Sequence, residues 1–253
     1  MKITILGSGT SQGIPVIACP CSVCSSDDLR DKRLRVSVLI EHEGKNIVID
    51  SGPDFRYQML RAGVKHLEAI LFTHEHKDHI AGLDDIRAFN YRQQTAVNVY
   101  AHPRVHEAIK REFHYAFSES KYPGLPVITL HEIENTDFSA EGISVVPIEV
   151  MHHLLPVFGF RIGDFTYITD AKTVSEREKR KIYGSKILVI NALQKDNHLS
   201  HFTLDEAIAF AEEIRAEKTY FTHISHKMGL HADVSKLLPP GIEIAYDEMV
   251  FEI

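Results

Sequence analysis

Short runs rich in Val and Ile recur along nearly the whole chain, and they constrain the fold more than any other feature of the sequence. β-Branched residues in runs of this kind, bounded by Gly, Pro and polar residues, are typical of β-strands. The strands predicted in this way are 3–6, 36–40, 46–50, 68–73, 97–101, 143–150, 167–170, 187–191, 219–223, 242–246 and 249–253. So many strands in one chain predict two sheets rather than one.

Helical patterns lie between these strands. The predicted helices are 55–62, 78–89, 105–117, 175–183 and 204–216. The last begins with Thr203, followed three residues later by Glu206, which is a capping-box arrangement. Strand pairs dominate early and strands alternate with helices later, so we expect an α/β fold with two mixed β-sheets flanked by helices. No linker or repeat divides the sequence, and we expect a single domain over residues 1–253.

Composition limits the classes of function. The chain of 253 residues is 44% hydrophobic and 25% charged, as an ordinary globular protein is. Its formal net charge of -7 disfavours binding to long nucleic acid and favours a small substrate. No apolar run is long enough for a membrane span, and the N-terminal run breaks at Gly7, too early for a secretory signal. We therefore expect a cytoplasmic location and no membrane partner.

Three histidines and an aspartate follow the predicted strand that ends at Thr73. His74, His76, Asp78 and His79 stand together between this strand and a predicted helix. Imidazole and carboxylate groups released from the end of a rigid strand can converge on a metal ion. A polar surface loop is the alternative, but burying so many unpaired polar groups would be costly. The spacing therefore predicts two adjacent metal ions.

The segment from His74 to His79 resembles the H-x-H-x-D-H signature of the metallo-β-lactamase superfamily. The resemblance implies an αββα sandwich and further metal ligands in a fixed order. The implied ligands are His153, with His152 as the open alternative, Asp170 as a bridging carboxylate, and His223. A histidine followed six residues later by Gly159 looks like the family pattern and favours His153 over His152. On helix-capping preferences alone, Asp170 could instead be an N-cap.

Three cysteines, Cys19, Cys21 and Cys24, lie close together. Thiolates at this spacing suit one tetrahedral zinc, but a closed structural site needs a fourth ligand. No fourth cysteine exists, so a histidine is needed, and His223 and His226 stand three residues apart. If His223 faces the active site, His226 remains free for the zinc. The alternative is a set of thiols that bind no metal.

The cysteine cluster, the glycine-rich stretch from Gly7 to Pro15 and the terminal histidine pair together resemble the PhnP-type phosphodiesterases of the carbon-phosphorus lyase pathway. In that family the cysteines and the second histidine of the pair hold a structural zinc. The ligands implied here are Cys19, Cys21, Cys24 and His226. The resemblance also implies that His201 is a catalytic histidine, with His198 as its rival, and it suggests a homodimer.

The expected reaction is hydrolysis of a small phosphodiester, and by resemblance a five-membered cyclic one such as phosphoribosyl 1,2-cyclic phosphate. Two active-site ions, Mn or Zn, would lower the pKa of a shared water, whose hydroxide attacks phosphorus. Asp78 and His201 are the expected catalytic residues. Asp50 is expected to orient a ligand histidine, with a cap of the turn at Ser51, Gly52 and Pro53 as the alternative. The alternatives are a tRNA-processing nuclease, a thioester or lactone hydrolase of the same superfamily, and a non-catalytic zinc-stabilised scaffold.

Overall fold

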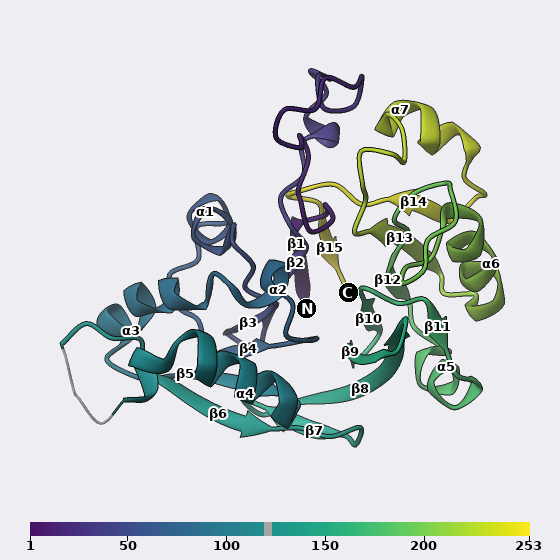
Figure 1. Cartoon of the computed structure of the whole chain (residues 1–253). Coiled ribbons are helices and arrows are strands. Elements are labelled where there is room, and N and C mark those ends of the chain that lie inside the picture. Colours follow the sequence, from purple (N-terminus) through teal and green to yellow (C-terminus); the bar gives the residue numbers. More distant parts are fainter. Residues whose placement is uncertain (119–122) are drawn as a thin grey trace.

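The structure, a computed structural model, describes residues 1–118 and 123–253. Two β-sheets face each other and helices cover the outer face of each, which gives an αββα sandwich (Figure 1). This is the fold class that the order of strands and helices predicts. No helix of the described ranges is long and apolar enough to cross a membrane.

The first sheet, within the described residues, has seven strands in the order β15-β1-β2-β3-β4-β5-β6. The four strands from β15 to β3 pair antiparallel, whereas those from β3 to β6 are parallel. The strands are β1 (Lys2–Gly7), β2 (Ser37–His42), β3 (Lys45–Ile49), β4 (Ala69–Leu71), β5 (Val97–Ala101), β6 (Ile128–Glu132) and β15 (Val250–Glu252). Because parallel strands end at the same edge, the loops after β3, β4 and β5 leave the sheet together.

The second sheet, counted over the same described ranges, has eight strands. Its main path is β11-β8-β9-β10-β12-β13-β14, and β7 pairs with β8. The strands are β7 (Phe138–Ala140), β8 (Ile143–His152), β9 (Leu155–Ile162), β10 (Phe165–Ile168), β11 (Thr173–Val174), β12 (Ile187–Asn191), β13 (Lys218–Thr222) and β14 (Ile242–Ile244). The run from β10 to β14 is parallel, so β10, β12 and β13 also end at one edge.

The helices divide between the two outer faces. Those of the first sheet are α1 (Phe55–Arg61), α2 (Lys77–Ile80), α3 (Arg87–Gln93) and α4 (Pro103–Glu112). Those of the second are α5 (Glu176–Ile182), α6 (Leu204–Ile214) and α7 (His231–Val234). The predicted capping box of α6 is confirmed, since Thr203 Oγ1 accepts a hydrogen bond from the Glu206 amide and the Glu206 carboxylate accepts one from the Thr203 amide.

Buried apolar side chains fill three layers of the sandwich. The layer between the sheets includes Ile5 and Tyr167, neither of which is exposed. A second layer, beneath α5 and α6, includes Phe221, and the third, beneath α1 to α4, includes Phe72. Removing this apolar surface from water is the main contribution to stability, and it leaves the strand ends as rigid supports for polar groups.

Most predicted elements are confirmed, with differences at their ends. Each predicted strand overlaps an observed one. The predicted helix 78–89 is divided into α2, the 3-10 turn η2 (Leu83–Ile86) and α3. The break lies at Gly82, where a Cβ atom would stand 2.1 Å from the Gly52 carbonyl oxygen. The sequence-based prediction missed β6, β7, β9, β11 and α7.

Candidate metal centre

The loop that carries the histidine cluster is fixed by Asp50, directly after β3. Asp50 is fully buried, and its carboxylate accepts hydrogen bonds from the Thr73 amide at 2.9 Å and the Thr73 hydroxyl at 2.8 Å. His79 donates from Nδ1 to the same carboxylate at 2.7 Å. The ring of His79 therefore turns Nε2 towards the other site residues, as the interpretation of Asp50 as an orienting group predicts.

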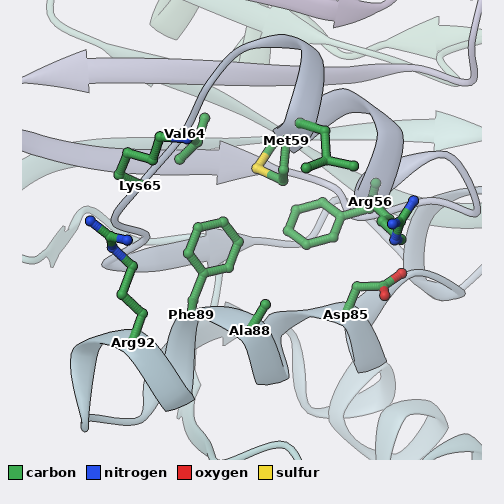
Figure 2. Close-up of a pocket in the computed structure, with 10 residues that line it drawn as sticks. Arg56, Met59, Val64, Lys65, Asp85, Ala88, Phe89 and Arg92 are labelled. Atoms are coloured by element: carbon green, nitrogen blue, oxygen red, sulfur yellow. The ribbon is translucent and has the colours of Figure 1, made fainter.

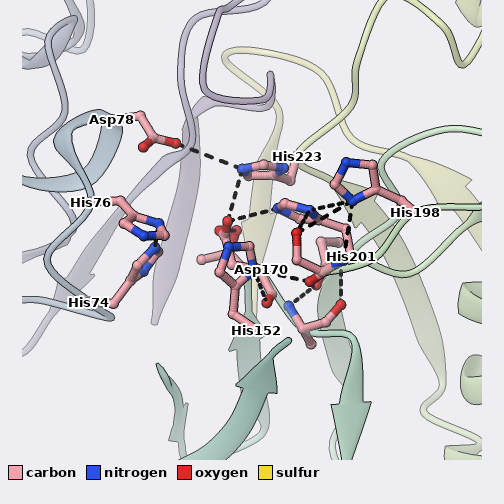
Figure 3. Close-up of polar contacts among 12 residues, drawn as sticks. His74, His76, Asp78, His152, Asp170, His198, His201 and His223 are labelled. Atoms are coloured by element: carbon pink, nitrogen blue, oxygen red, sulfur yellow. Dashed lines mark hydrogen bonds and ion pairs between the residues drawn. The ribbon is translucent and has the colours of Figure 1, made fainter. Parts of the chain in front are cut away.

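Asp78, Asp170 and His223 come together from three distant segments (Figure 3), and His79, the residue after Asp78, joins them. His79 Nε2 lies 3.2 Å from an Asp78 oxygen and 3.4 Å from an Asp170 oxygen, and His223 Nε2 lies 3.3 Å from the other Asp170 oxygen. Ligand atoms at about 2.0–2.1 Å from one tetrahedral ion stand about 3.3 Å apart. The separations therefore fit coordination.

His74 and His76 form the other side of the cluster. Nε2 of His74 lies 2.9 Å from Nδ1 of His76, and the ring of His152 is centred 5.9 Å and 5.3 Å from their rings. His152 donates from Nδ1 to the carbonyl oxygens of Asp170 and Ser200, each at 3.0 Å. These bonds leave Nε2 of His152 as the nitrogen that can bind a metal.

The structure places His152, and not the preferred His153, in the cluster. His153 is exposed and lies at the turn between β8 and β9, with a positive φ of 56°. Side chains alternate along a strand, so His152 shares a face of β8 with the buried Val150. The backbone thus directs His152 to the cluster, where it groups with Asp170 and His201.

His201 lies inside this cluster. Its Nε2 is 3.0 Å from an Asp170 oxygen, and its ring stacks on that of His223 with centres 4.8 Å apart. His198, the rival, is further from the carboxylate and contacts His201 itself, with 3.2 Å between the two Nδ1 atoms (Figure 3). Burial lowers the pKa of His201 to about 4, although Asp170 acts against that shift.

The charges of the centre favour ionised carboxylates. Burial would raise the pKa of Asp170, but His223 and His79 outweigh it and hold the pKa well below its ordinary value. Burial lowers the pKa of His74 well below the ordinary histidine value, so this ring stays neutral. Neutral imidazoles and ionised carboxylates are the forms that bind metals.

Buried ring nitrogens that make no hydrogen bond also point to a cation. Among the described residues, Nε2 of His79 and both ring nitrogens of His223 are buried without a hydrogen bond. Such groups cost free energy unless something else binds them. Histidine and carboxylate donors suit divalent Zn, Mn or Fe, so the residues fit the metal centre that their order in the sequence predicts.

Three residues of this region have strained backbones. Asp50, Asp170 and His223 each follow a strand closely and have positive φ angles of 61°, 58° and 58°. Non-glycine residues rarely take this conformation, and such strain persists where the surrounding structure holds a functional group in place.

Asn191, which was not singled out from the sequence, helps hold Asp170. Its side chain accepts a hydrogen bond from the amide of Ala171, the residue after Asp170, at 2.7 Å, and donates one to the Ala171 carbonyl oxygen at 2.9 Å.

Replacing Asp50 by Asn should lower the affinity for active-site metal by about 10- to 100-fold, the usual cost of losing an orienting carboxylate. Asn keeps the size of the side chain but presents one oxygen and no charge to Thr73 and His79. Metal titration of the metal-free protein measures the effect. Asp137→Asn, at an exposed position, is the control. An unchanged affinity in Asp50→Asn would mean that its contacts do not orient His79.

The predicted zinc ligands are also brought together. Nδ1 of His226 lies 3.3, 3.4 and 3.6 Å from the sulfur atoms of Cys19, Cys21 and Cys24. Sulfur at about 2.3 Å and nitrogen at about 2.0 Å from a tetrahedral zinc stand about 3.5 Å apart. An N–H···S hydrogen bond from the Cys24 amide, together with one from His226, lowers the pKa of Cys21 to about 6. The four side chains therefore fit one zinc ion.

The comparisons with known sequences agree with this geometry. Residues 45–224 match the family model described as a beta-lactamase superfamily domain. An octanoyltransferase of Porphyromonas gingivalis is 40% identical over 250 residues, which cover 98% of this chain and 50% of that protein. Coenzyme PQQ synthesis protein B of Methylorubrum extorquens is 30% identical over 119 residues, 42% of this chain and 38% of the relative. The chain thus spans about half the length, or less, of these curated relatives.

Solved structures resemble the whole chain. A crystal structure described as a new diphosphatase from the PhnP family has a TM-score of 0.93 and 38% identity, covering 100% of this chain and 97% of its own. Zinc-bound PqqB from Methylobacterium extorquens has a TM-score of 0.82, with 20% identity and full coverage of both chains. Human short-form tRNase Z has a TM-score of 0.70 and 21% identity, covering 100% of this chain and 99% of its own. The chain therefore belongs to the metallo-β-lactamase superfamily and, within it, to the PhnP family.

Proposed function

We propose that this chain is a metal-dependent phosphodiesterase that hydrolyses a small, cyclic ribose phosphodiester. The observation that carries the proposal is the convergence of imidazole and carboxylate groups from distant segments on one small volume. The proposed ligands of two divalent ions are His74, His76, Asp78, His79, His152, Asp170 and His223. The PhnP-family diphosphatase supports chemistry at phosphorus, since its sequence is similar along the whole chain.

Two divalent ions bound here would supply Lewis acidity, which polarises phosphoryl oxygens and makes water a better nucleophile. The side chains fix where that chemistry takes place. Asp170 directs one oxygen towards His79 and the other towards His223 and His201, so its carboxylate would be among the groups that hold the ions. Asp50 and the hydrogen bonds of His152 to backbone carbonyls hold the ligand rings without further reorganisation.

His201 is the proposed general acid. Its Nε2 faces the site, while its Nδ1 lies 3.2 Å from His198 Nδ1 and 3.1 Å from the Ser200 hydroxyl. With its pKa at about 4, His201 is a neutral ring at neutral pH and can carry its proton at Nε2. That proton can pass to the oxygen that leaves phosphorus while the less buried His198 donates one from its Nδ1 to Nδ1 of His201. Hydrolysis then adds one water across a P–O bond and yields a monoester and a free hydroxyl group.

Replacing His201 by Asn should lower kcat for a diester with an alkoxide leaving group by about 10²- to 10⁴-fold. The loss should be much smaller for a nitrophenyl diester, because nitrophenolate leaves without a proton. Steady-state kinetics on both substrates, with metal analysis, measure this difference. Equal losses on both substrates, accompanied by loss of metal, would instead make His201 a metal ligand.

A nuclease that acts on long RNA is less well supported. The formal net charge of -7 opposes binding to a polyanion, and the resemblance to tRNase Z, at 21% identity, concerns the fold alone. Acyl hydrolysis is the second candidate, because one relative is named octanoyltransferase. That relative is twice as long as the part matched here, so its acyl transfer can belong to its other half.

Side-by-side assays distinguish these candidates. The metal-loaded protein is tested on a 1,2-cyclic ribose phosphate, on bis(p-nitrophenyl) phosphate, on a short RNA and on an octanoyl thioester, with Mn or Zn. We expect the cyclic phosphate to have the highest kcat/KM. The Asp170→Asn variant gives the background rate for each substrate. Thioester turnover above that of both phosphodiesters would overturn the proposal.

A further inference from the structure

A second pocket lies between α1 and α3 on the outer face of the first sheet (Figure 2). Its volume is about 290 Å³, close to the lower end of the range for small-molecule sites. Phe55, Met59 and Phe89 form an apolar floor, and each is buried. The rings of Phe55 and Phe89 meet edge to face with centres 6.4 Å apart. None of the proposed metal ligands lines this pocket.

The rim of this α1/α3 pocket carries unequal charges at its two ends. Lys65 and Arg92 stand at one end, beside Val64 (Figure 2). Arg56 stands at the other end beside Asp85, which its charge attracts. In the described ranges, 1–118 and 123–253, neither Lys65 nor Arg92 has an ion pair or a side-chain hydrogen bond, whereas most of the chain's lysines and arginines do. The Lys65/Arg92 end therefore has positive charge that no side chain balances.

We propose that the α1/α3 pocket binds a free medium-chain carboxylate, with its head between Lys65 and Arg92 and its apolar tail on Leu60, Ala88 and Phe89. A cationic amphiphile would be repelled at the end where the head lies. A small anion without a tail would leave the accessible apolar lining, chiefly Leu60 and Ala88, in contact with water. A protein segment is excluded by the small volume, because peptide-sized partners bury far more surface.

The apolar lining of the pocket is needed for affinity, because the two surface charges alone would bind an anion only weakly. Exposed lysine and arginine pairs with an anion are worth little in water. Here the tail would bury apolar area of the pocket lining that is still accessible, mainly on Leu60 and Ala88, and its binding would hold the carboxylate next to both cations. Head and tail are therefore expected to depend on each other, and removing either should weaken binding strongly.

Three ligands test the proposal on the full-length, metal-loaded protein by isothermal titration calorimetry. Octanoate carries head and tail, octyltrimethylammonium reverses the charge, and inorganic phosphate lacks the tail. We expect saturable binding of octanoate, with the other two at least about tenfold weaker. Equal affinity for the ammonium compound or for phosphate, or no saturation by octanoate, would overturn the proposal.

Substitutions locate the site. The double variant Lys65→Gln, Arg92→Gln should bind octanoate at least about tenfold more weakly, and it should fold normally because both side chains are exposed. Arg180→Gln, at an exposed position on α5, is the matched control and should bind octanoate as the parent protein does. Undiminished binding by the double variant would place the carboxylate elsewhere, for example on the active-site metals, and so contradict the assignment.

Discussion

Replacing Asp170 by Asn should abolish turnover while leaving the fold intact. Asp170 is almost fully buried, and its two oxygens lie within 3.4 Å of ring nitrogens from His79, His201 and His223. The change keeps the shape of the side chain and removes the negative charge of the carboxylate that lies beside all three rings. We expect turnover to fall by at least about 10³-fold, on the scale of losing a preorganised electrostatic contact at a reaction centre. Metal content should fall with it, as metal analysis of the purified protein would measure.

Asp164→Asn is the control for this experiment. Asp164 precedes the same strand, β10, but its carboxylate pairs with Lys186 at 2.7 Å near the surface, and such pairs contribute little. The control should keep its metal and its turnover. Circular dichroism of both variants checks that the fold is unchanged. If Asp170→Asn kept full activity and full metal content, the convergence of residues around it would not be a metal centre.

Replacing Cys24 by Ser should remove the structural zinc and destabilise the protein. Cys24 is the buried thiol of its cluster, and burial raises its pKa to about 11 in the absence of a cation. A zinc ion would offset that cost, so the loss of one thiolate should lower the free energy of unfolding by about 3 kcal/mol or more. For a chain of this size that corresponds to a fall in Tm of about 6–12 °C. Thermal melting and zinc analysis measure both effects.

Ser25→Ala provides the comparison for Cys24→Ser. Ser25 is the next residue in the same loop and is exposed, with one long hydrogen bond of 3.5 Å to Pro20. This variant should keep its zinc and its Tm. The destabilised Cys24→Ser protein should also bind active-site metal more weakly, because His226 and His223 stand three residues apart on one loop. Unchanged zinc content and Tm in Cys24→Ser would show that no zinc depends on this cluster.

The local part of the metal centre could be predicted from the sequence because its residues are neighbours. His74 to His79 follow one strand, and their spacing alone indicates a shared site. Asp170, His223 and His226 could be placed only through a resemblance, since nothing in their own segments shows which distant strand ends meet. The structure places Asp170 and His223 beside the histidine cluster, and His226 beside the three cysteines.

The difference between the preferred His153 and the position of His152 in the cluster has a physical cause. The predicted strand 143–150 ended two residues too early, and the hairpin that joins β8 to β9 was missed. Had the alternation of Ile148 and Val150 been continued along the strand, it would have favoured His152. β9 itself contains Pro156 and Gly159, which weaken a strand pattern. Gly159 is needed there because a Cβ atom would lie 2.7 Å from the Tyr167 carbonyl oxygen of the neighbouring strand.

The α1/α3 pocket could not be predicted from sequence. Phe55, Met59 and Phe89 fit the ordinary apolar face of a helix, and only packing leaves a cavity between them. The charges of Lys65 and Arg92 likewise have no pattern in the sequence. Whether an acidic side chain forms an ion pair with Lys65 or Arg92 is decided only by the folded surface, and among the described residues none does.

The proposed ligand residues come from both sheets, because His74 to His79 follow β4 in one and Asp170 and His223 follow β10 and β13 in the other. A cation bound by residues of both sheets would oppose separation of the two sheets. By linkage, each tenfold rise in free cation above its Kd adds about 1.4 kcal/mol to the free energy of unfolding. When the cation is scarce, we therefore expect the protein to lose its activity and also to be cleaved more readily by proteases.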